Sequence, residues 1–176
     1  MRKVTYGGAC SLDGFLTGPG EAMDWLHFSP DVQRIMAEYW KRIDTILMGR
    51  KTWEFAAASG GGGGGPSKGI TTYVFSRTLR ARPPKGVALV SDDAGGFVRA
   101  LKAKPGKEIC LMGGSELAHS LFEAGLVDEV GFNIHPVLLG AGVPVFLPSR
   151  QRIRLELLEN RTIDGGCVLA TYRVVG

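Results

Sequence analysis

Residues 46–52 read Ile-Leu-Met-Gly-Arg-Lys-Thr, and residues 109–115 read Ile-Cys-Leu-Met-Gly-Gly-Ser. Each stretch predicts a buried strand that ends in glycine and passes directly into a helix. The first N–H groups of a helix lack partners within it, and the helix dipole adds partial positive charge, so such turns attract phosphate. Two of them in one small sheet could hold a pyrophosphate. Alternatively, the glycines only let each helix pack close to its strand.

Outward from these two stretches, strand and helix patterns alternate until about residue 125. Short apolar runs predict strands over residues 4–9, 44–48, 71–76, 87–91, 108–112 and 127–135. Helical patterns begin at Ser29-Pro30, after Gly49, near Gly96 and near Ser115. The first of these helices is expected to carry its apolar face as far as Ile43.

The end of the chain has a different pattern. Residues 154–160 and 167–174 predict two strands joined through an Asp-Gly step, which is typical of an antiparallel hairpin. Alternating strands and helices favour parallel βαβ units. The sequence therefore predicts an α/β fold with a mixed, mostly parallel sheet, flanking helices and a C-terminal antiparallel hairpin.

Length and composition limit the class of protein. The chain has 176 residues, 44% of them hydrophobic and 22% charged, which predicts one globular domain over residues 1–176. No run approaches the ~18 apolar residues of a membrane span, and the N-terminus has no signal-peptide core, so we expect a cytoplasmic protein with no membrane partner. The net charge of +4 is mild, and no basic cluster is interleaved with aromatic residues, so no nucleic-acid partner is expected.

Two further features concern glycine and cysteine. Residues 56–69, with the run Gly60–Gly65, predict a mobile surface loop because such a stretch cannot pack a core. Cys10, Cys110 and Cys167 are far apart and odd in number, which predicts free thiols that are buried or half-buried. With three scattered histidines and no CxxC, no metal site is expected.

Several polar residues follow predicted strands. Arg50 and Lys51 add positive charge to the first glycine turn, and Thr52 and Ser115 add hydroxyl groups. Arg77 follows Ser76 at a strand end, where a guanidinium suits a ribose 2′-phosphate, although a solvated loop arginine is an equal alternative.

Two carboxylates have ambiguous roles. Asp31, in the first turn of its helix, could donate a proton to a substrate ring or serve only as a partner of the helix dipole. Asp13 is similarly ambiguous: it could be a catalytic carboxylate, or it could belong to an Asp-Gly turn of the kind that is common without any function. Trp25 fits the core or the wall of a pocket.

Four segments in chain order resemble the dihydrofolate reductase superfold: Ser11–Leu16, Ile46–Glu54, Val74–Leu79 and Leu111–Leu117. The resemblance spans residues 2–174. His135–Gly142, with Pro144-Val145-Phe146 after it, is more similar to the branch typified by the reductase domain of bacterial riboflavin biosynthesis (RibD C-terminal type).

The resemblance implies an NADPH-dependent reductase and assigns parts of the cofactor to particular residues. Ala9 and Leu16 would contact the nicotinamide carboxamide. Ser76 and Arg77 would bind the adenosine end and its 2′-phosphate. The phosphate and pyrophosphate residues would be Gly49, Arg50, Lys51 and Thr52, together with Met112, the glycine pair Gly113-Gly114, which is often joined by a cis peptide, Ser115 and Glu116.

On the substrate side the resemblance is looser. Asp31 lies one or two positions away from the place of the catalytic acidic residue of dihydrofolate reductase. Asn133 takes the place of a strand threonine that supports that acidic residue. The nearest model is therefore reduction of 5-amino-6-(5-phosphoribosylamino)uracil, with dihydrofolate reduction or a non-catalytic nucleotide-binding protein as alternatives. The resembling branch is dimeric, and the apolar strands over residues 127–174 also favour a homodimer.

Overall fold

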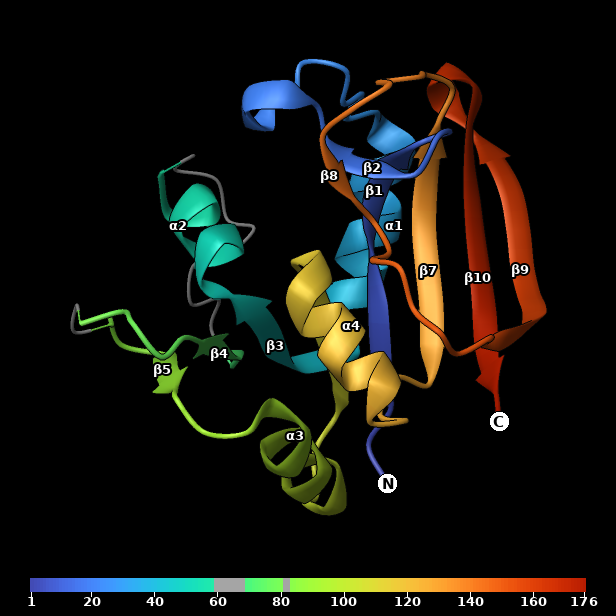
Figure 1. Ribbon diagram of the computed structural model, residues 1–176. Helices are drawn as coiled ribbons and strands as arrows, with labels where there is room; N and C mark the ends of the chain where they lie inside the picture. The colour runs from blue at the N-terminus through green and yellow to red at the C-terminus, as the bar shows by residue number, and fades with distance from the viewer. Residues whose placement is uncertain (59–68, 81–82) are drawn as a thin grey trace.

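The computed structural model describes residues 1–58, 69–80 and 83–176. Its centre is an eight-stranded sheet in the order β5-β4-β3-β6-β1-β7-β10-β9 (Figure 1). The strands are β1 (Val4–Ser11), β3 (Ile43–Gly49), β4 (Thr71–Phe75), β5 (Val87–Val90), β6 (Glu108–Gly113), β7 (Glu129–His135), β9 (Arg154–Ile163) and β10 (Cys167–Val175). Neighbours from β5 to β7 are parallel, whereas β10 is antiparallel to β7 and to β9. The predicted fold class is confirmed, including the terminal hairpin.

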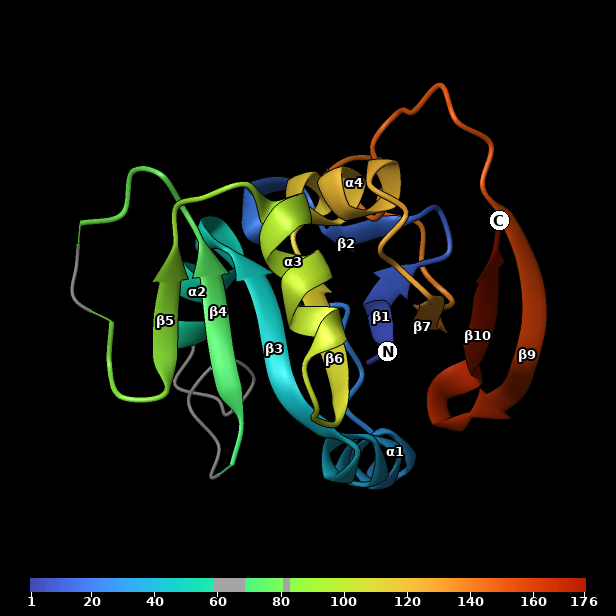
Figure 2. The same ribbon diagram turned by 90° about the horizontal axis from the view of Figure 1, so that it is seen from below.

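Within the described residues, four α-helices cover the two faces of the sheet: α1 (Pro30–Lys41), α2 (Arg50–Ala58), α3 (Ala94–Ala103) and α4 (Ser115–Glu123). Side chains of a strand alternate between faces, so Met48 packs with Trp40 and Trp53 from α1 and α2, whereas Leu47 joins the α3 and α4 core. Figure 2 shows α3 and α4 on one side of the sheet and α1 on the other. The parallel strands therefore end together at one edge, where the loops to α2 and α4 begin.

A small second sheet lies beside this edge. It pairs β2 (Phe15–Thr17) with β8 (Val143–Pro144). A short 3-10 turn follows β2 at Pro19–Glu21, and another joins β9 to β10 at Asp164–Gly166. The Tyr6 hydroxyl donates a hydrogen bond to the Val145 carbonyl at 2.7 Å, which ties the β8 segment to the core. Both segments were expected to be irregular, because strands of two or three residues leave no periodic pattern.

The structure corrects three boundaries. Ile43 begins β3 instead of ending α1, since its buried side chain continues the helical spacing by coincidence. Ala56–Ala58 belong to α2 and not to a loop, as the high helix propensity of alanine favours. The hairpin strand β9 extends through Thr162 and Ile163. The run Gly60–Gly65 lies outside the described residues.

The cysteine prediction is confirmed, since Cys10, Cys110 and Cys167 are free and buried. Among the helices that the structure describes, none is long and apolar enough to cross a membrane.

Candidate active site

The N-termini of α2 and α4 meet at the carboxyl edge of the sheet. A Cβ atom built on Gly49 would lie 3.5 Å from the backbone nitrogen of Gly114, and one built on Gly114 would lie 3.3 Å from Thr52 Oγ1. The structure thus brings together Gly49 and Thr52 of the first motif and Gly114 of the second. The N-termini of α2 and α4 are therefore adjacent, and the free N–H groups of helix N-termini favour the binding of phosphate.

The glycine pair after β6 has an unusual backbone. Gly113 has a φ of +111°, which disfavours any side chain, and the Gly113–Gly114 peptide bond is cis. The Ser115 hydroxyl, on a residue only 5% exposed, donates to the Pro144 carbonyl instead of pointing at the cradle. Ser115 can therefore offer a ligand its backbone N–H, while its side chain attaches α4 to β8.

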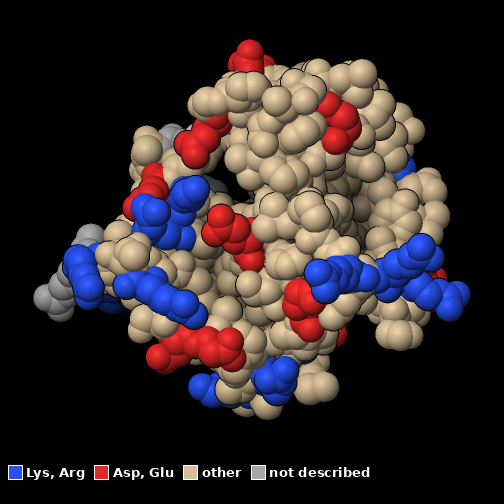
Figure 3. Space-filling model, in the orientation of Figure 1, with Lys and Arg blue, Asp and Glu red and all other residues tan. Residues whose placement is uncertain are grey.

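Positive charge lies on the α2 side of this cradle. Arg50 forms an ion pair with Glu54 one helical turn later, at 2.9 Å, and Lys51 is exposed. Figure 3 shows a hollow between the α2 side and the α4 side of the molecule, with basic side chains gathered on the α2 side. Exposed ion pairs of this kind are weak, so Arg50 can exchange Glu54 for a phosphate at little cost.

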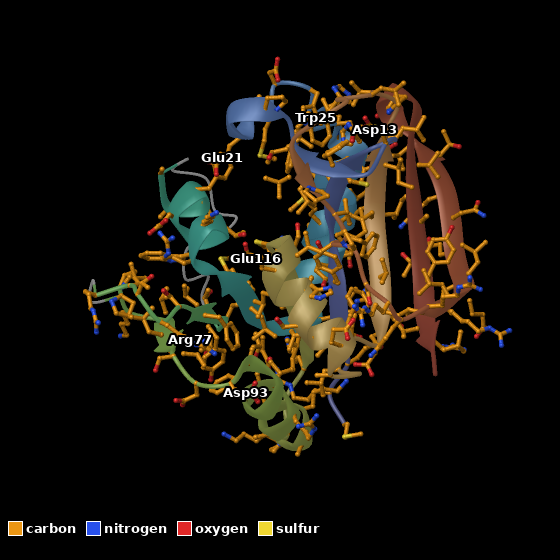
Figure 4. All side chains as sticks on the ribbon, viewed as in Figure 1. Asp13, Glu21, Trp25, Arg77, Asp93 and Glu116 are labelled. Carbon is orange, nitrogen blue, oxygen red and sulfur yellow. The ribbon has the colours of Figure 1, made fainter. Side chains whose placement is uncertain are left out.

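Ser76 and Arg77 lie where β4 ends. Ser76 Oγ accepts hydrogen bonds from the backbone nitrogens of Thr78 and Leu79, at 3.2 and 2.9 Å, so its side chain shapes the turn. Arg77 is exposed and has no ion-pair partner within the described residues. Figure 4 shows Arg77 near Asp93, which caps α3 by accepting from the Gly96 nitrogen, on the β4–β5 side of the molecule.

The other residues assigned to the cofactor lie around the same edge. Ala9 pairs with Asn133 across β1 and β7, and Leu16 is half-buried on β2. Glu116 is exposed in the first turn of α4, and Figure 4 shows it on the side of α4 that faces α2. Met112 packs into the α1–α2 core, so its side chain is structural in this arrangement.

The two carboxylates considered as acids are both engaged elsewhere. Asp13 accepts hydrogen bonds from the backbone nitrogens of Leu139 and Gly140 and from the Ser11 hydroxyl, at 3.0, 2.7 and 2.6 Å. The Ser11 and Gly140 hydrogen bonds lower the pKa of Asp13, so it is ionised at neutral pH. Asp31 forms an ion pair with Arg34 on the outside of α1. As the structure stands, Asp13 anchors a loop and Asp31 pairs with its own helix.

A buried polar cluster of Asn133, His135 and Cys167 lies at the end of β7. From the sequence, a role in the site was predicted for Asn133 but not for His135 or Cys167. Asn133 Nδ2 lies 3.1 Å from His135 Nε2, and His135 Nδ1 lies 3.4 Å from Cys167 Sγ. The Trp25 ring meets the His135 ring edge to face at 5.1 Å. Burial, and then the proximity of His27, lowers the pKa of His135, which keeps the imidazole neutral.

One signal in the sequence could have found this cluster. Asn133 and His135 are two residues apart on a predicted strand, so both point to the same face, and this is the face that packs against α1. Cys167 joins them through the register of β10 on β7, which no local pattern reveals. No group of metal-ligating side chains exists among the described residues.

A protein-family model and a sequence relative both match nearly the whole chain. The model of the RibD C-terminal domain matches residues 2–169. The uncharacterised protein YyaP of Bacillus subtilis is 34% identical over 181 residues, which cover 98% of this chain and 95% of that protein.

Solved structures share the fold at lower identity. A candidate riboflavin biosynthesis protein from Shewanella sp. PV-4 has a TM-score of 0.85 at 24% identity, with full coverage of both chains. The deaminase and 5-amino-6-(5-phosphoribosylamino)uracil reductase of Thermotoga maritima has a TM-score of 0.73 at 15% identity, covering 99% of this chain and 57% of that one. Enterococcus faecalis dihydrofolate reductase, complexed with NADP(H), has a TM-score of 0.70 at 18% identity, covering 99% and 97%. At these identities the likeness shows a common fold.

Proposed function

Because the chain belongs to the RibD C-terminal domain family, we propose that it is an NADPH-dependent reductase acting on a pyrimidine or pterin-like substrate. The nearest model is reduction of 5-amino-6-(5-phosphoribosylamino)uracil, the activity named for the Thermotoga maritima structure. The observation that carries the proposal is the cradle in which Gly49 and Gly114 leave two helix N-termini bare beside Thr52.

The cradle fits the pyrophosphate of a dinucleotide. A side chain at Gly49 or Gly114 would fill the space where the two N-termini meet, so these positions favour close approach of a ligand to the backbone. Arg50 and Lys51 supply charge on one side, and Arg77 would take a 2′-phosphate, which favours NADPH over NADH. The Enterococcus faecalis enzyme of the same fold is complexed with NADP(H), which supports this choice of cofactor.

When bound, NADPH supplies the hydride, and this chain's residues orient the cofactor and substrate. Ala9 and Leu16 would border the nicotinamide, with Trp25 and Asn133 on the substrate side of β1 and β7. Asp13 is held ionised by its hydrogen bonds, and Asp31 would first have to leave Arg34 to act as a proton donor. The proton therefore comes most simply from water in this arrangement.

The test is NADPH oxidation by the purified protein with two substrates in parallel, 5-amino-6-(5-phosphoribosylamino)uracil and dihydrofolate. We expect turnover with the aminouracil. Turnover with dihydrofolate alone would favour the dihydrofolate reductase alternative, and tight NADPH binding without turnover on either would favour a nucleotide-binding protein. Failure to bind NADPH would overturn the proposal.

A homodimer is part of the proposal. β9 is an edge strand, and the apolar side chains of Leu155 and Leu157 on it are 44% and 49% exposed. An exposed apolar edge is normally covered, and a second copy of this chain is the occupant that the family resemblance implies. The cytoplasmic location stays a prediction.

A further inference from the structure

Asn133 carries a buried polar atom without a protein partner. The residue is only 9% exposed, and its side-chain oxygen Oδ1 has no hydrogen bond within the described residues. An unpaired buried carbonyl costs stability, and native proteins keep few of them. The partner of this oxygen is therefore a water molecule or a bound ligand.

His135 determines which end of the Asn133 amide is left free. Asn133 Nδ2 lies 3.1 Å from His135 Nε2, and because an amide nitrogen can only donate, this contact is a hydrogen bond in the tautomer that leaves Nε2 unprotonated. His135 is neutral because burial lowers its pKa, and its one ring proton then lies on Nδ1, which faces Cys167 Sγ at 3.4 Å. This chain of contacts holds Asn133 Nδ2 toward the histidine and leaves Oδ1 as an acceptor.

Asn133 lies on the side of the site that is proposed to bind the substrate. Asn133 pairs with Ala9 on the neighbouring strand, and its side chain lies on the α1 face of the sheet. Trp25 closes the cluster with its ring edge against His135. No carboxylate among the described residues is hydrogen-bonded to Asn133 or His135, so the acceptor has no neighbouring negative charge in direct contact.

We propose that Asn133 Oδ1 accepts a hydrogen bond from a ring N–H of the substrate, and that His135 is the positioning residue that keeps this oxygen available. An uncharged acceptor favours neutral lactam rings, such as uracils, over protonated 2,4-diaminopyrimidines, which a carboxylate would stabilise. This inference rests on the proposed function, because it specifies the class of substrate ring that the proposed reductase site would bind.

The test measures binding of 5,6-diaminouracil and 2,4-diaminopyrimidine to NADPH-saturated protein by calorimetry. Asn133→Leu keeps the approximate volume and removes both polar atoms. We expect 5,6-diaminouracil affinity to fall at least about tenfold, because the acceptor oxygen is gone, with NADPH affinity unchanged. Asn160→Leu, on the exposed strand β9, is the matched control and should bind both ligands as the wild type does.

Two further variants test charge and positioning. Asn133→Asp should shift preference toward 2,4-diaminopyrimidine, since it supplies the missing negative charge. His135→Gln retains a carbonyl that can accept from Asn133 Nδ2, so it should bind 5,6-diaminouracil more tightly than His135→Leu, with equal NADPH affinity in both. A merely structural histidine would change melting temperature without this order of affinities.

The outcomes separate this inference from the proposed function. Loss of NADPH binding by the wild type would contradict the proposed function itself. If NADPH binds but 5,6-diaminouracil does not, or if Asn133→Leu binds it as tightly as the wild type, the assignment of Asn133 is wrong. A lower melting temperature in Asn133→Leu with unchanged 5,6-diaminouracil affinity would mean that the cluster serves only to hold β7 against β10.

Discussion

Gly114 contributes only backbone to the point where the N-termini of α2 and α4 meet. In Gly114→Ala the new methyl would lie 3.3 Å from Thr52 Oγ1, so the threonine must move within the cradle. We expect a folded protein whose NADPH affinity is at least about tenfold weaker, equivalent to roughly 1.4 kcal/mol. Cofactor titration and thermal melting on the same sample measure both effects.

The control for this substitution is Gly95→Ala in α3, where a Cβ would make only ordinary contacts of 3.5 Å or more. It should bind NADPH normally and be as stable as the wild type or slightly more so, since alanine favours a helix over glycine. A Gly114→Ala protein that is destabilised yet binds NADPH as tightly as the wild type would mean that this glycine serves packing alone.

His135 gives the stability of the protein a predictable dependence on pH. Its pKa in the folded state lies below the ordinary 6.5, so the unfolded chain binds more protons just below that pH. The contribution of His135 to the free energy of unfolding is therefore highest above about pH 6.5, where His135 is neutral in both states. It declines as the pH falls toward the lower pKa of His135 in the folded state. Denaturant unfolding between about pH 5 and pH 8 should show this slope, and His135→Gln should flatten it.

His119→Gln removes an imidazole from α4, on the other face of the sheet, and is the control for that measurement. A wild-type slope that persists in His135→Gln would assign the pH dependence to other groups.

Among the elements, the loop after β7 is held to the β1–β2 turn by the Asp13 carboxylate, together with a backbone hydrogen bond from the Leu12 nitrogen to the Val137 carbonyl at 3.0 Å. Asp13 accepts from the backbone nitrogens of Leu139 and Gly140, 126 and 127 residues away. Asp13→Asn should lower the melting temperature and increase hydrogen exchange at Leu139 and Gly140, because one amide oxygen cannot replace the ionised carboxylate.

The pKa of Asp13 is lowered, so its contribution is present above the ordinary value of 3.8 and is lost as the pH falls through the folded pKa. The difference in melting temperature between wild type and Asp13→Asn should therefore shrink in strong acid. A constant difference down to about pH 2 would contradict the anchoring role.

The elements themselves could largely be predicted because their signals are local. Apolar runs and glycine stops located the parallel strands, and Ser29 with Pro30 located α1; Ser29 Oγ indeed accepts from the Val32 nitrogen. The pairing of β2 with β8 could not be predicted, since it joins segments more than 120 residues apart through very few contacts. Ile43 was misplaced because its spacing fits both a helix and the strand that follows.

In the site, too, the features that depend on local sequence patterns could be predicted, whereas contacts between distant residues could not. The backbone cradle at Gly49 and Gly114 follows from strand-glycine-helix patterns, and its two halves meet as the parallel sheet requires. The side-chain partners do not follow from such patterns. Ser115 donates to Pro144 and His135 contacts Cys167, and each partner is set by tertiary packing. The residue type alone therefore does not indicate which partner a polar side chain has in the folded protein.

At the scale of the whole molecule, the β9–β10 hairpin exposes several apolar side chains. Leu155 and Leu157 lie opposite Val174 and Tyr172 in the β9–β10 hairpin. Leu155 also lines a cavity of about 300 Å³, together with Phe146 and Ile153. We expect a dimer by light scattering, and Leu157→Lys should yield a monomer near 18.9 kDa. Ala100→Lys on exposed α3 is the charge-matched control. A wild-type mass near 18.9 kDa at micromolar concentration would contradict the dimer.

The central claim is that the two helix N-termini and Arg77 together form a site for NADPH. Its most direct test is a fluorescence titration of the wild type and Arg77→Ala with NADPH and NADH, with Arg99→Ala on α3 as the control for lost charge. The wild type should prefer NADPH by about ten- to a hundredfold, the value of one charge-assisted hydrogen bond, and Arg77→Ala should lose most of that preference while keeping its NADH affinity. Equal dissociation constants of the wild type for NADPH and NADH would contradict the account.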